Sequence, residues 1–118
     1  MADTMKSGPL VIVIPENKMG RGNDELGAVL IKAFMHAVAG QAQKPAVIIF
    51  YNTGVKLTVQ GSDVLEDLKQ LESEGVQILV CGTCLNYFEI KDKLAVGIVS
   101  NMYDIVESMS SAGRLLTP

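Results

Sequence analysis

Short aliphatic runs alternate along the chain with longer amphipathic stretches. The runs are apolar almost throughout and are bounded by Gly, Pro or polar residues, which is the pattern of buried strands. Five strands are therefore predicted, of which the fourth is weakened by Gly97. They cover residues 10–14, 46–50, 76–81, 94–99 and 114–117.

The stretches between the strands place apolar residues at helical spacing and predict three long helices. Their capping and terminating residues are, in chain order, Asn23 and Gly40, Ser62 and Gly75, and Ser100 or Asn101 and Gly113. The side chains expected to face the core are Leu26, Val29, Leu30, Ala33, Phe34, Ala37 and Val38, then Val64, Leu65, Leu68 and Leu71, then Met102, Ile105, Val106 and Met109. Residues 85–93 predict a short helical turn.

Apolar strands separated by amphipathic helices favour a mainly parallel sheet, because such sheets are buried on both sides and joined by right-handed crossovers. The predicted fold class is α/β, a single three-layer domain with a five-stranded sheet and helices on both faces. Loops that follow the strands lie along one edge of this sheet, where ligands bind. The residues expected at that edge are Asn17, Tyr51, Asn52, residues 81–84, Asn101 and Tyr103.

Composition bounds the size and the partners of the domain. With 118 residues and 48% hydrophobic content, the chain suits one compact domain over residues 9–118, after a flexible leader at residues 1–8. A net charge of −3 and scattered basic residues argue against nucleic-acid binding. No apolar run is long enough for a membrane span and the first residues lack a secretory signal, so a cytoplasmic location is expected.

The only two cysteines, Cys81 and Cys84, lie three positions apart at the end of the third predicted strand. In a reducing compartment this spacing indicates a metal, redox or nucleophilic role, since a bridge closing so short a loop stabilises little. Unpaired N–H groups and the helix dipole at a strand-to-helix junction are expected to lower a thiol pKa, so that either cysteine could hold sulfane sulfur as a persulfide. The alternative is that Cys81 is a small buried hydrophobe and Cys84 the exposed thiol.

Two other chemistries fit a C-x-x-C motif. Dithiol/disulfide exchange is one, although thioredoxin-type folds place the motif after an early strand beside a cis-proline, and here it follows the third strand with no proline nearby. Zinc binding is the other, but structural zinc takes four ligands and the chain offers this pair and His36, so a second subunit's cysteines would be needed. The glycines of residues 19–24 fit turn formation, since a complete phosphate-binding motif is missing. No metal and no cofactor are predicted in the single chain.

Four segments carry a resemblance to a known family. They are residues 17–27, which begin N-K-M-G and end D-E-L-G, residues 51–57 (Y-N-T-G-V-K-L), residues 81–88 (C-G-T-C-L-N-Y-F) and residues 99–104 (V-S-N-M-Y-D). Together they resemble the carboxyl-terminal domain of the YedF family, in the DsrE/DsrF-like superfamily, over nearly the whole chain from Pro9 onward. The resemblance implies a five-stranded α/β fold, homo-oligomers (dimers, trimers or hexamers), and a role in sulfur relay or selenium metabolism in the bacterial cytoplasm.

The resemblance also implies roles for the cysteines and a partner. In the sulfur relay members a cysteine just after the third strand accepts sulfur as a persulfide, and Cys81 matches that position, with Cys84 as a family-specific neighbour. YedF-like proteins are usually longer, with an amino-terminal TusA-like domain that this chain lacks. The chain is then either an excised domain or a stand-alone member of the family, and a TusA-like sulfur carrier is the expected donor or acceptor.

The predicted function is a cytoplasmic sulfur (or selenium) carrier or sulfurtransferase-like domain that holds sulfane sulfur on Cys81 or Cys84, with the other cysteine as resolving thiol. The side chains predicted to bind the substrate are Asn17, Tyr51, Asn52, Asn101 and Tyr103. The competing hypotheses are a non-catalytic oligomeric assembly or metal-binding module, and a dithiol/disulfide redox protein. Which cysteine accepts sulfur, and whether the chain is an enzyme, stay open at this point.

Overall fold

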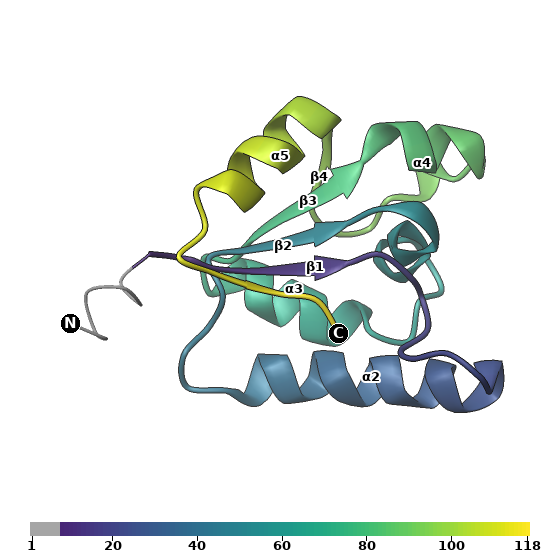
Figure 1. Cartoon of the computed structure of the whole chain (residues 1–118). Coiled ribbons are helices and arrows are strands. Elements are labelled where there is room, and N and C mark those ends of the chain that lie inside the picture. The colour runs from purple at the N-terminus through teal and green to yellow at the C-terminus, as the bar shows by residue number, and fades with distance from the viewer. Residues whose placement is uncertain (1–7) are drawn as a thin grey trace.

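The computed structural model describes residues 8–118, which form a five-stranded sheet with helices on both faces (Figure 1). The strands are β1 (Leu10–Ile14), β2 (Val47–Phe50), β3 (Gln77–Cys81), β4 (Ile98–Ser100) and β5 (Arg114–Leu116). They lie in the order β4-β3-β2-β1-β5, and each neighbouring pair is parallel. The predicted α/β class is confirmed. The leader predicted at residues 1–8 falls, apart from Gly8, outside the described residues.

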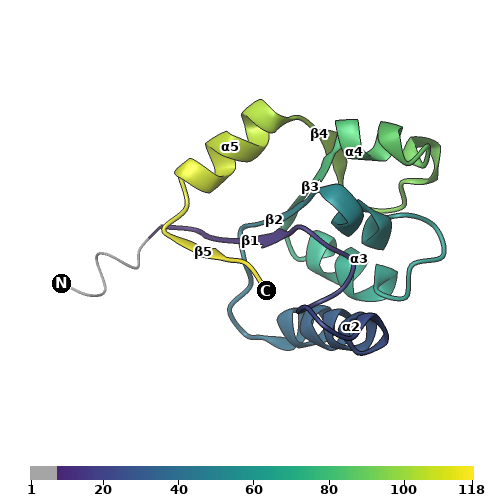
Figure 2. The same ribbon diagram turned by 45° about the vertical axis from the view of Figure 1, so that its right-hand side comes forward.

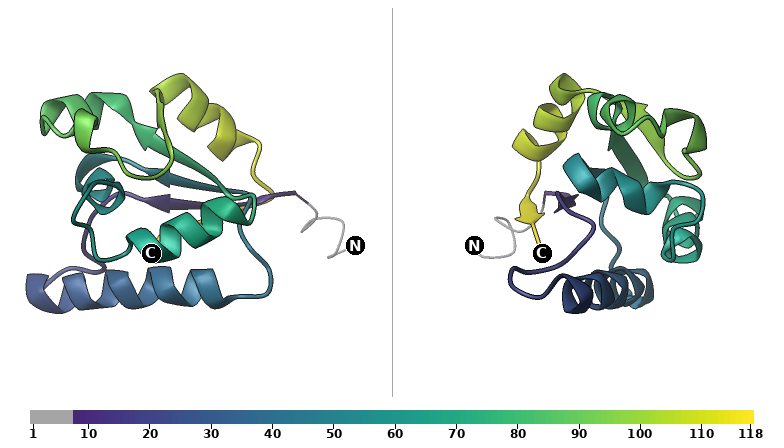
Figure 3. Two further views of the ribbon diagram at one scale, coloured as in Figure 1. Left: turned by 180° about the vertical axis from the view of Figure 1, so that it is seen from behind. Right: turned by 90° about the vertical axis from the view of Figure 1, so that its right-hand side faces the viewer.

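The helices are divided between the two faces of the sheet (Figures 1 and 3). On one face are α2 (Asp24–Gly40) and α3 (Leu65–Ser73), which pack against each other, and on the other are α4 (Gly82–Tyr87) and α5 (Met102–Ser110). Two short 3-10 helices, η1 (Asn52–Thr58) and η2 (Lys91–Lys93), lie in the connections. Figure 2 shows β4 and β5 at the two edges of the sheet, with β2 in the middle.

The core is built from the central strands, as expected of a sheet covered on both sides. Ile14, Ile48, Ile49 and Phe50 are completely buried, and their neighbours in β3 are nearly so. The strand run at residues 10–14 was predicted with the bounds observed, because Pro15 follows an unbroken aliphatic run. Among residues 8–118, no helix combines the length and the apolar character needed to cross a bilayer.

The prediction of which face of α2 packs on the core is wrong in part. Five of the seven side chains expected to be inside are exposed, namely Leu26 (54%), Val29 (55%), Leu30 (40%), Ala33 and Ala37. The stripe that is buried instead consists of Gly27, Ile31, Met35, Val38 and Ala39. The helix carries two adjacent apolar stripes, and periodicity alone does not decide which one the sheet covers.

Several element boundaries differ from the prediction, and the two largest differences among them, at α4 and β4, involve glycine. α4 begins at Gly82, directly after β3, and not at residue 85. A Cβ at Gly82 would lie 2.9 Å from Val99 Cγ1, so only glycine lets the start of α4 approach β4 this closely. β4 begins at Ile98 and not at residue 94, because Gly97 adopts φ +81 and interrupts the extended backbone.

Candidate functional site

Both cysteines lie at the carboxyl edge of the sheet, where β3 passes into α4. Cys81 is the last residue of β3 and the N-cap of α4, and its side chain is only 3% exposed. Cys84 lies in the first turn of α4 and is half-buried. Both thiols are free. The expectation that Cys84 is the more exposed thiol is therefore confirmed, and a ligand that enters from solvent meets Cys84 first.

A cavity of about 560 Å³ opens beside Cys84, and we call it the cysteine pocket. The residues that line it are Asn52, Thr53, Thr83, Cys84, Tyr87 and Phe88. One wall is the start of η1 and the other is α4, two segments that pack against each other at the right-hand edge in Figure 1. The cavity thus combines a nucleophilic sulfur, three hydroxyl groups and two aromatic rings.

The backbone of η1 is shaped to direct a hydrogen-bond donor at Cys84. The N–H of Asn52 donates to Cys84 Sγ over 3.1 Å. Asn52 adopts φ 52, in the left-handed region that asparagine tolerates better than most residues. Just before it, the N–H of Tyr51 donates to the carbonyl oxygen of Ile14 over 3.2 Å, which ties η1 to the end of β1. The position of the donor therefore depends on the packing of β1 and η1.

The electrostatic surroundings of Cys84 differ from the prediction. Burial raises the pKa of the Cys84 thiol, and the neighbouring Cys81 raises it further, whereas the N–H of Asn52 acts in the opposite direction. The prediction of a lowered pKa is wrong for Cys84, because desolvation outweighs the single hydrogen bond to its sulfur. Cys84 is consequently a protonated thiol near neutral pH, and the pocket carries no negative charge from this group.

Asn52 is the one predicted substrate-binding residue that lines the cysteine pocket. Asn17 lies next to it: its N–H donates to Thr53 Oγ1 over 3.2 Å, and its side chain lines an adjacent hollow of about 200 Å³. The side chain of Tyr51 is partly buried and packs on the core. Asn17 and Tyr51 thus support the wall of the pocket and do not line it.

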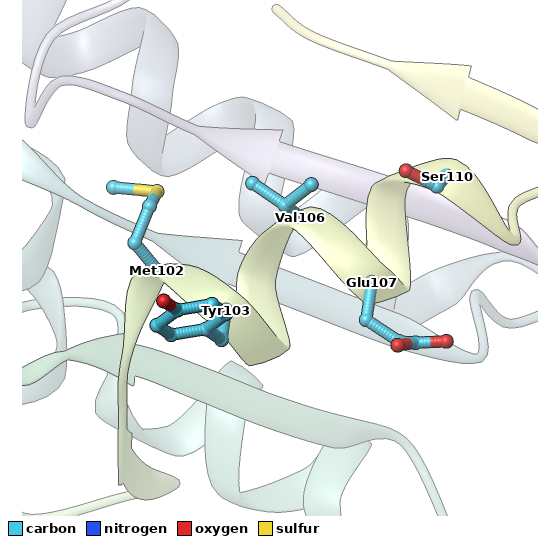
Figure 4. A pocket seen from close by; sticks show the side chains of 5 residues that line it. All are labelled: Met102, Tyr103, Val106, Glu107 and Ser110. Carbon is cyan, nitrogen blue, oxygen red and sulfur yellow. The ribbon is translucent and has the colours of Figure 1, made fainter.

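The structure places Asn101 and Tyr103 elsewhere. Asn101 caps α5, since its Oδ1 accepts from the N–H of Asp104 over 2.9 Å and its Nδ2 donates to Asp104 Oδ2 over 3.1 Å. Tyr103 is 90% exposed and lines a different hollow of about 590 Å³ along α5. This α5 hollow is lined by Met102, Tyr103, Val106, Glu107 and Ser110, which project from the helix in two rows (Figure 4).

Four residues of the cysteine pocket were not among the predicted site residues, namely Thr53, Thr83, Tyr87 and Phe88. The motif itself offered a signal for two of them. Once a helix begins at the C-x-x-C motif, positions three and four residues after Cys84 lie on the same helical face as its thiol. Tyr87 and Phe88 occupy those positions, but the prediction started the helix too late to use this spacing.

The arrangement of the two thiols permits covalent sulfur chemistry. Within residues 8–118, no three His, Cys, Asp or Glu side chains lie close enough to hold a metal ion. The two thiols, by contrast, are close enough for Cys81 to influence the protonation of Cys84. A vicinal pair of this kind can carry sulfur on one thiol and release it through the other.

Comparisons with known proteins agree with this fold. No curated protein matches the chain. Several solved structures do, among them protein of unknown function MTH1491 from Methanobacterium thermoautotrophicum (22% identity, TM-score 0.66), the ychN protein from E. coli (18%, 0.65), and conserved protein of unknown function BT1422 from Bacteroides thetaiotaomicron (15%, 0.63). The matches cover 92%, 94% and 93% of this chain and 97%, 99% and 95% of those chains, respectively. At these identities the likeness shows the fold alone.

The sequence itself matches a family model, and the match extends over residues 11–118, from β1 to the end of the chain. It includes both cysteines and every residue of the cysteine pocket. The chain therefore belongs to the DsrE/DsrF-like family, which is associated with sulfur relay.

Proposed function

We propose that this protein is a sulfur carrier that accepts sulfane sulfur on Cys84 and holds it as a persulfide, with Cys81 as the resolving thiol. The observation that carries the proposal is the position of Cys84: half-buried in a 560 Å³ pocket, beside a second thiol, with the N–H of Asn52 3.1 Å from its sulfur. Cys81 is 3% exposed and is less suited to meet a donor.

Transfer of sulfur from a persulfide donor to Cys84 needs no further oxidant or reductant. Cys84 loses its proton and, as the thiolate, attacks the outer sulfur of a donor persulfide, R–S–SH, so that a new S–S bond forms and the old one breaks. The products are Cys84–S–SH and R–SH, and the thiol proton moves to the leaving thiolate. The reverse reaction with an acceptor thiol passes the sulfur on. Attack by Cys81 on the Cys84 sulfur instead expels hydrosulfide and closes the Cys81–Cys84 disulfide.

The finer assignment rests on the YedF-like segments, above all the block at residues 81–88. On this proposal the protein handles sulfur or selenium in the cytoplasm, with a TusA-like carrier as the donor or acceptor. Homo-oligomer formation is part of the same proposal. The exposed apolar side chains of Met102, Tyr103 and Val106 support it, because this much apolar surface on one short helix is more often found at an interface than facing solvent.

The second candidate function is dithiol/disulfide exchange, and the free adjacent thiols favour it. In that case the same two cysteines would cycle between the dithiol and the disulfide and would never hold an extra sulfur atom. The two functions therefore predict different masses for the protein after it meets a persulfide.

The test is the intact mass of the protein after exposure to a persulfide donor, measured with and without reductant. We expect one added sulfur atom that reductant removes, in the wild type and in Cys81→Ser but not in Cys84→Ser. The adduct should last longer in Cys81→Ser, because the resolving thiol is gone. Formation of the internal disulfide alone, or an adduct that survives in Cys84→Ser, would contradict the proposal.

A further inference from the structure

The charge next to the cysteine pocket comes from Lys56 of η1. Its ammonium nitrogen lies 4.5 Å from the centre of the Phe88 ring, and Phe88 lines the pocket. This cation–π contact holds a long, exposed side chain against the pocket wall. The rest of the Lys56 side chain lines the adjacent 200 Å³ hollow together with Asn17. Lys56 therefore contacts a residue of the cysteine pocket and lines the second hollow as well.

This lysine has no carboxylate partner in the part of the chain that the structure describes. The basic residues in ion pairs there are Lys18, Lys32, His36 and Lys44. The lining of the cysteine pocket contains no acidic residue, and the Cys84 thiol is protonated near neutral pH because burial raises its pKa. The positive charge of Lys56 is thus not neutralised locally, and nothing that lines the pocket would repel an anion.

Neutral groups of the pocket add hydrogen-bond donors. Thr53 Oγ1 already accepts the N–H of Asn17 over 3.2 Å, so its own hydrogen is free to donate into the pocket. Thr83 and Tyr87 contribute two more hydroxyl groups. A cation, three hydroxyl groups and no carboxylate make a better site for an anion than for a neutral or cationic molecule.

We propose that Lys56 is the anion-recognising residue of the cysteine pocket, and that the small molecules or chain ends that react at Cys84 carry a negative charge beside their reactive atom. The inference rests on the proposed function for the identity of the substrate as a sulfur donor. Thiosulfate and carboxylate-bearing persulfides have this charge. With thiosulfate the step is also balanced: Cys84–SH and S₂O₃²⁻ give Cys84–S–SH and SO₃²⁻, and the thiol proton passes to the new terminal sulfur.

Alkylation of Cys84 tests the charge preference apart from sulfur transfer. Iodoacetate and iodoacetamide react at the same carbon, but the first is an anion and the second is neutral. We expect Lys56→Gln to slow labelling of Cys84 by iodoacetate about fivefold, the order of magnitude for one unit charge near a solvent-exposed site, and to leave labelling by iodoacetamide unchanged. Lys56→Arg should keep the wild-type ratio. Lys69→Gln removes the same charge from the exposed side of α3 and is the matched control.

The sulfur donors are then compared in the same variants. The persulfides of mercaptopropionate and mercaptoethanol are similar in length, and only the first carries a carboxylate. We expect the wild type to take sulfur about fivefold faster from the carboxylate donor, and Lys56→Gln to lose that preference. Added salt should reduce the preference, because it screens an exposed charge.

The two hypotheses fail in different ways. Equal slowing of both alkylating reagents in Lys56→Gln, or no slowing of either, would overturn the role of Lys56 whatever the donor results. A normal charge effect on alkylation, combined with no sulfur adduct from any donor, would instead contradict the sulfur carrier function and leave an anion-selective thiol pocket.

Discussion

Two hollows of similar volume lie on this protein, and they differ in the chemical groups that line them and in the number of elements that supply those groups. The cysteine pocket, of about 560 Å³, is walled by η1 and α4 and contains a thiol, an oriented N–H group and three hydroxyl groups. The α5 hollow, of about 590 Å³, is lined by one helix and consists mainly of Met102, Tyr103 and Val106. Volume therefore does not identify a reactive site, whereas convergent polar groups from two segments do.

The two surfaces also differ in the number of elements that must pack together to form them. Asn52 and Cys84 come from different elements, and their contact requires β1, η1 and α4 to pack correctly. The residues of the α5 hollow follow one another at helical spacing and need no other element to bring them together (Figure 4). The first surface is suited to a small reactive ligand, and the second resembles a face that another protein surface could cover.

The largest effect we expect comes from moving the nucleophile from one hollow to the other. Cys84→Ser should lose the sulfur adduct completely, because the attacking atom is gone. Adding Ser110→Cys to that variant places a thiol in the α5 hollow, where no second cysteine and no oriented N–H group lie beside it. We expect intact mass to show no sulfur adduct on the double variant after exposure to the persulfide donor.

Ellman titration of the double variant is the control, since the new thiol must be shown to be accessible. An adduct on residue 110 at the wild-type rate would mean that any exposed thiol of this protein takes up sulfur. Sulfur uptake would then not depend on the groups that surround the thiol in the cysteine pocket.

The next effect concerns the packing that holds η1 in place. Gly54 is buried, and a Cβ there would overlap the carbonyl oxygen of Ile14 at the end of β1. Gly54→Ala should lower the free energy of unfolding by about 2 kcal/mol, because η1 must shift away from β1. The same shift displaces the Asn52 N–H, so labelling of Cys84 should change as well. Denaturant unfolding and iodoacetamide labelling measure the two consequences.

Gly40→Ala is the matched control for that substitution. Gly40 is the last residue of α2, and a Cβ there would meet no atom within 4 Å. We expect its unfolding free energy to stay near that of the wild type. If Gly54→Ala were as stable as Gly40→Ala and kept normal labelling of Cys84, η1 would not depend on its contact with β1.

The contacts between η1 and β1 also explain which parts of the site could be predicted from the sequence and which could not. The strands and the parallel sheet follow from aliphatic runs, and the motif at Cys81 and Cys84 follows from spacing alone. The donor at Asn52 does not, because it depends on the φ of 52 at Asn52 and on the contact of η1 with β1, and the hydrophobic pattern indicates neither. Asn101 follows β4 at the same edge as the cysteines, as expected, but an edge position does not determine what a side chain does there: that of Asn101 caps α5, and that of Tyr103 is exposed on the helix.

The α5 hollow yields the third prediction. If this face joins copies of the chain, Val106→Glu should weaken self-association at least about tenfold, since Val106 is 48% exposed in the single chain and an interface would bury it. Sulfur uptake on Cys84 should be unchanged. Sedimentation velocity over a range of protein concentrations measures the association.

Gln60→Glu adds the same charge on an exposed turn after η1 and should leave association unchanged. A monomeric wild type at all concentrations would remove the proposed role of the α5 face. Equal weakening by both variants would point to net charge and not to this surface.

The smallest expected effect separates the influence of Cys81 on Cys84 from that of burial. Burial is the main cause that raises the pKa of Cys84, and the Cys81 thiol adds to it. Cys81→Ala removes the second cause, so the pKa of Cys84 should fall toward its ordinary value while staying raised by burial. Only the thiolate reacts, so below its pKa Cys84 should be alkylated by iodoacetamide faster in Cys81→Ala than in the wild type, and the two rates should converge at high pH. A pH–rate profile that stays in place would show that the two thiols ionise independently, and one that moves to higher pH would show that Cys81 favours ionisation of Cys84 and does not oppose it.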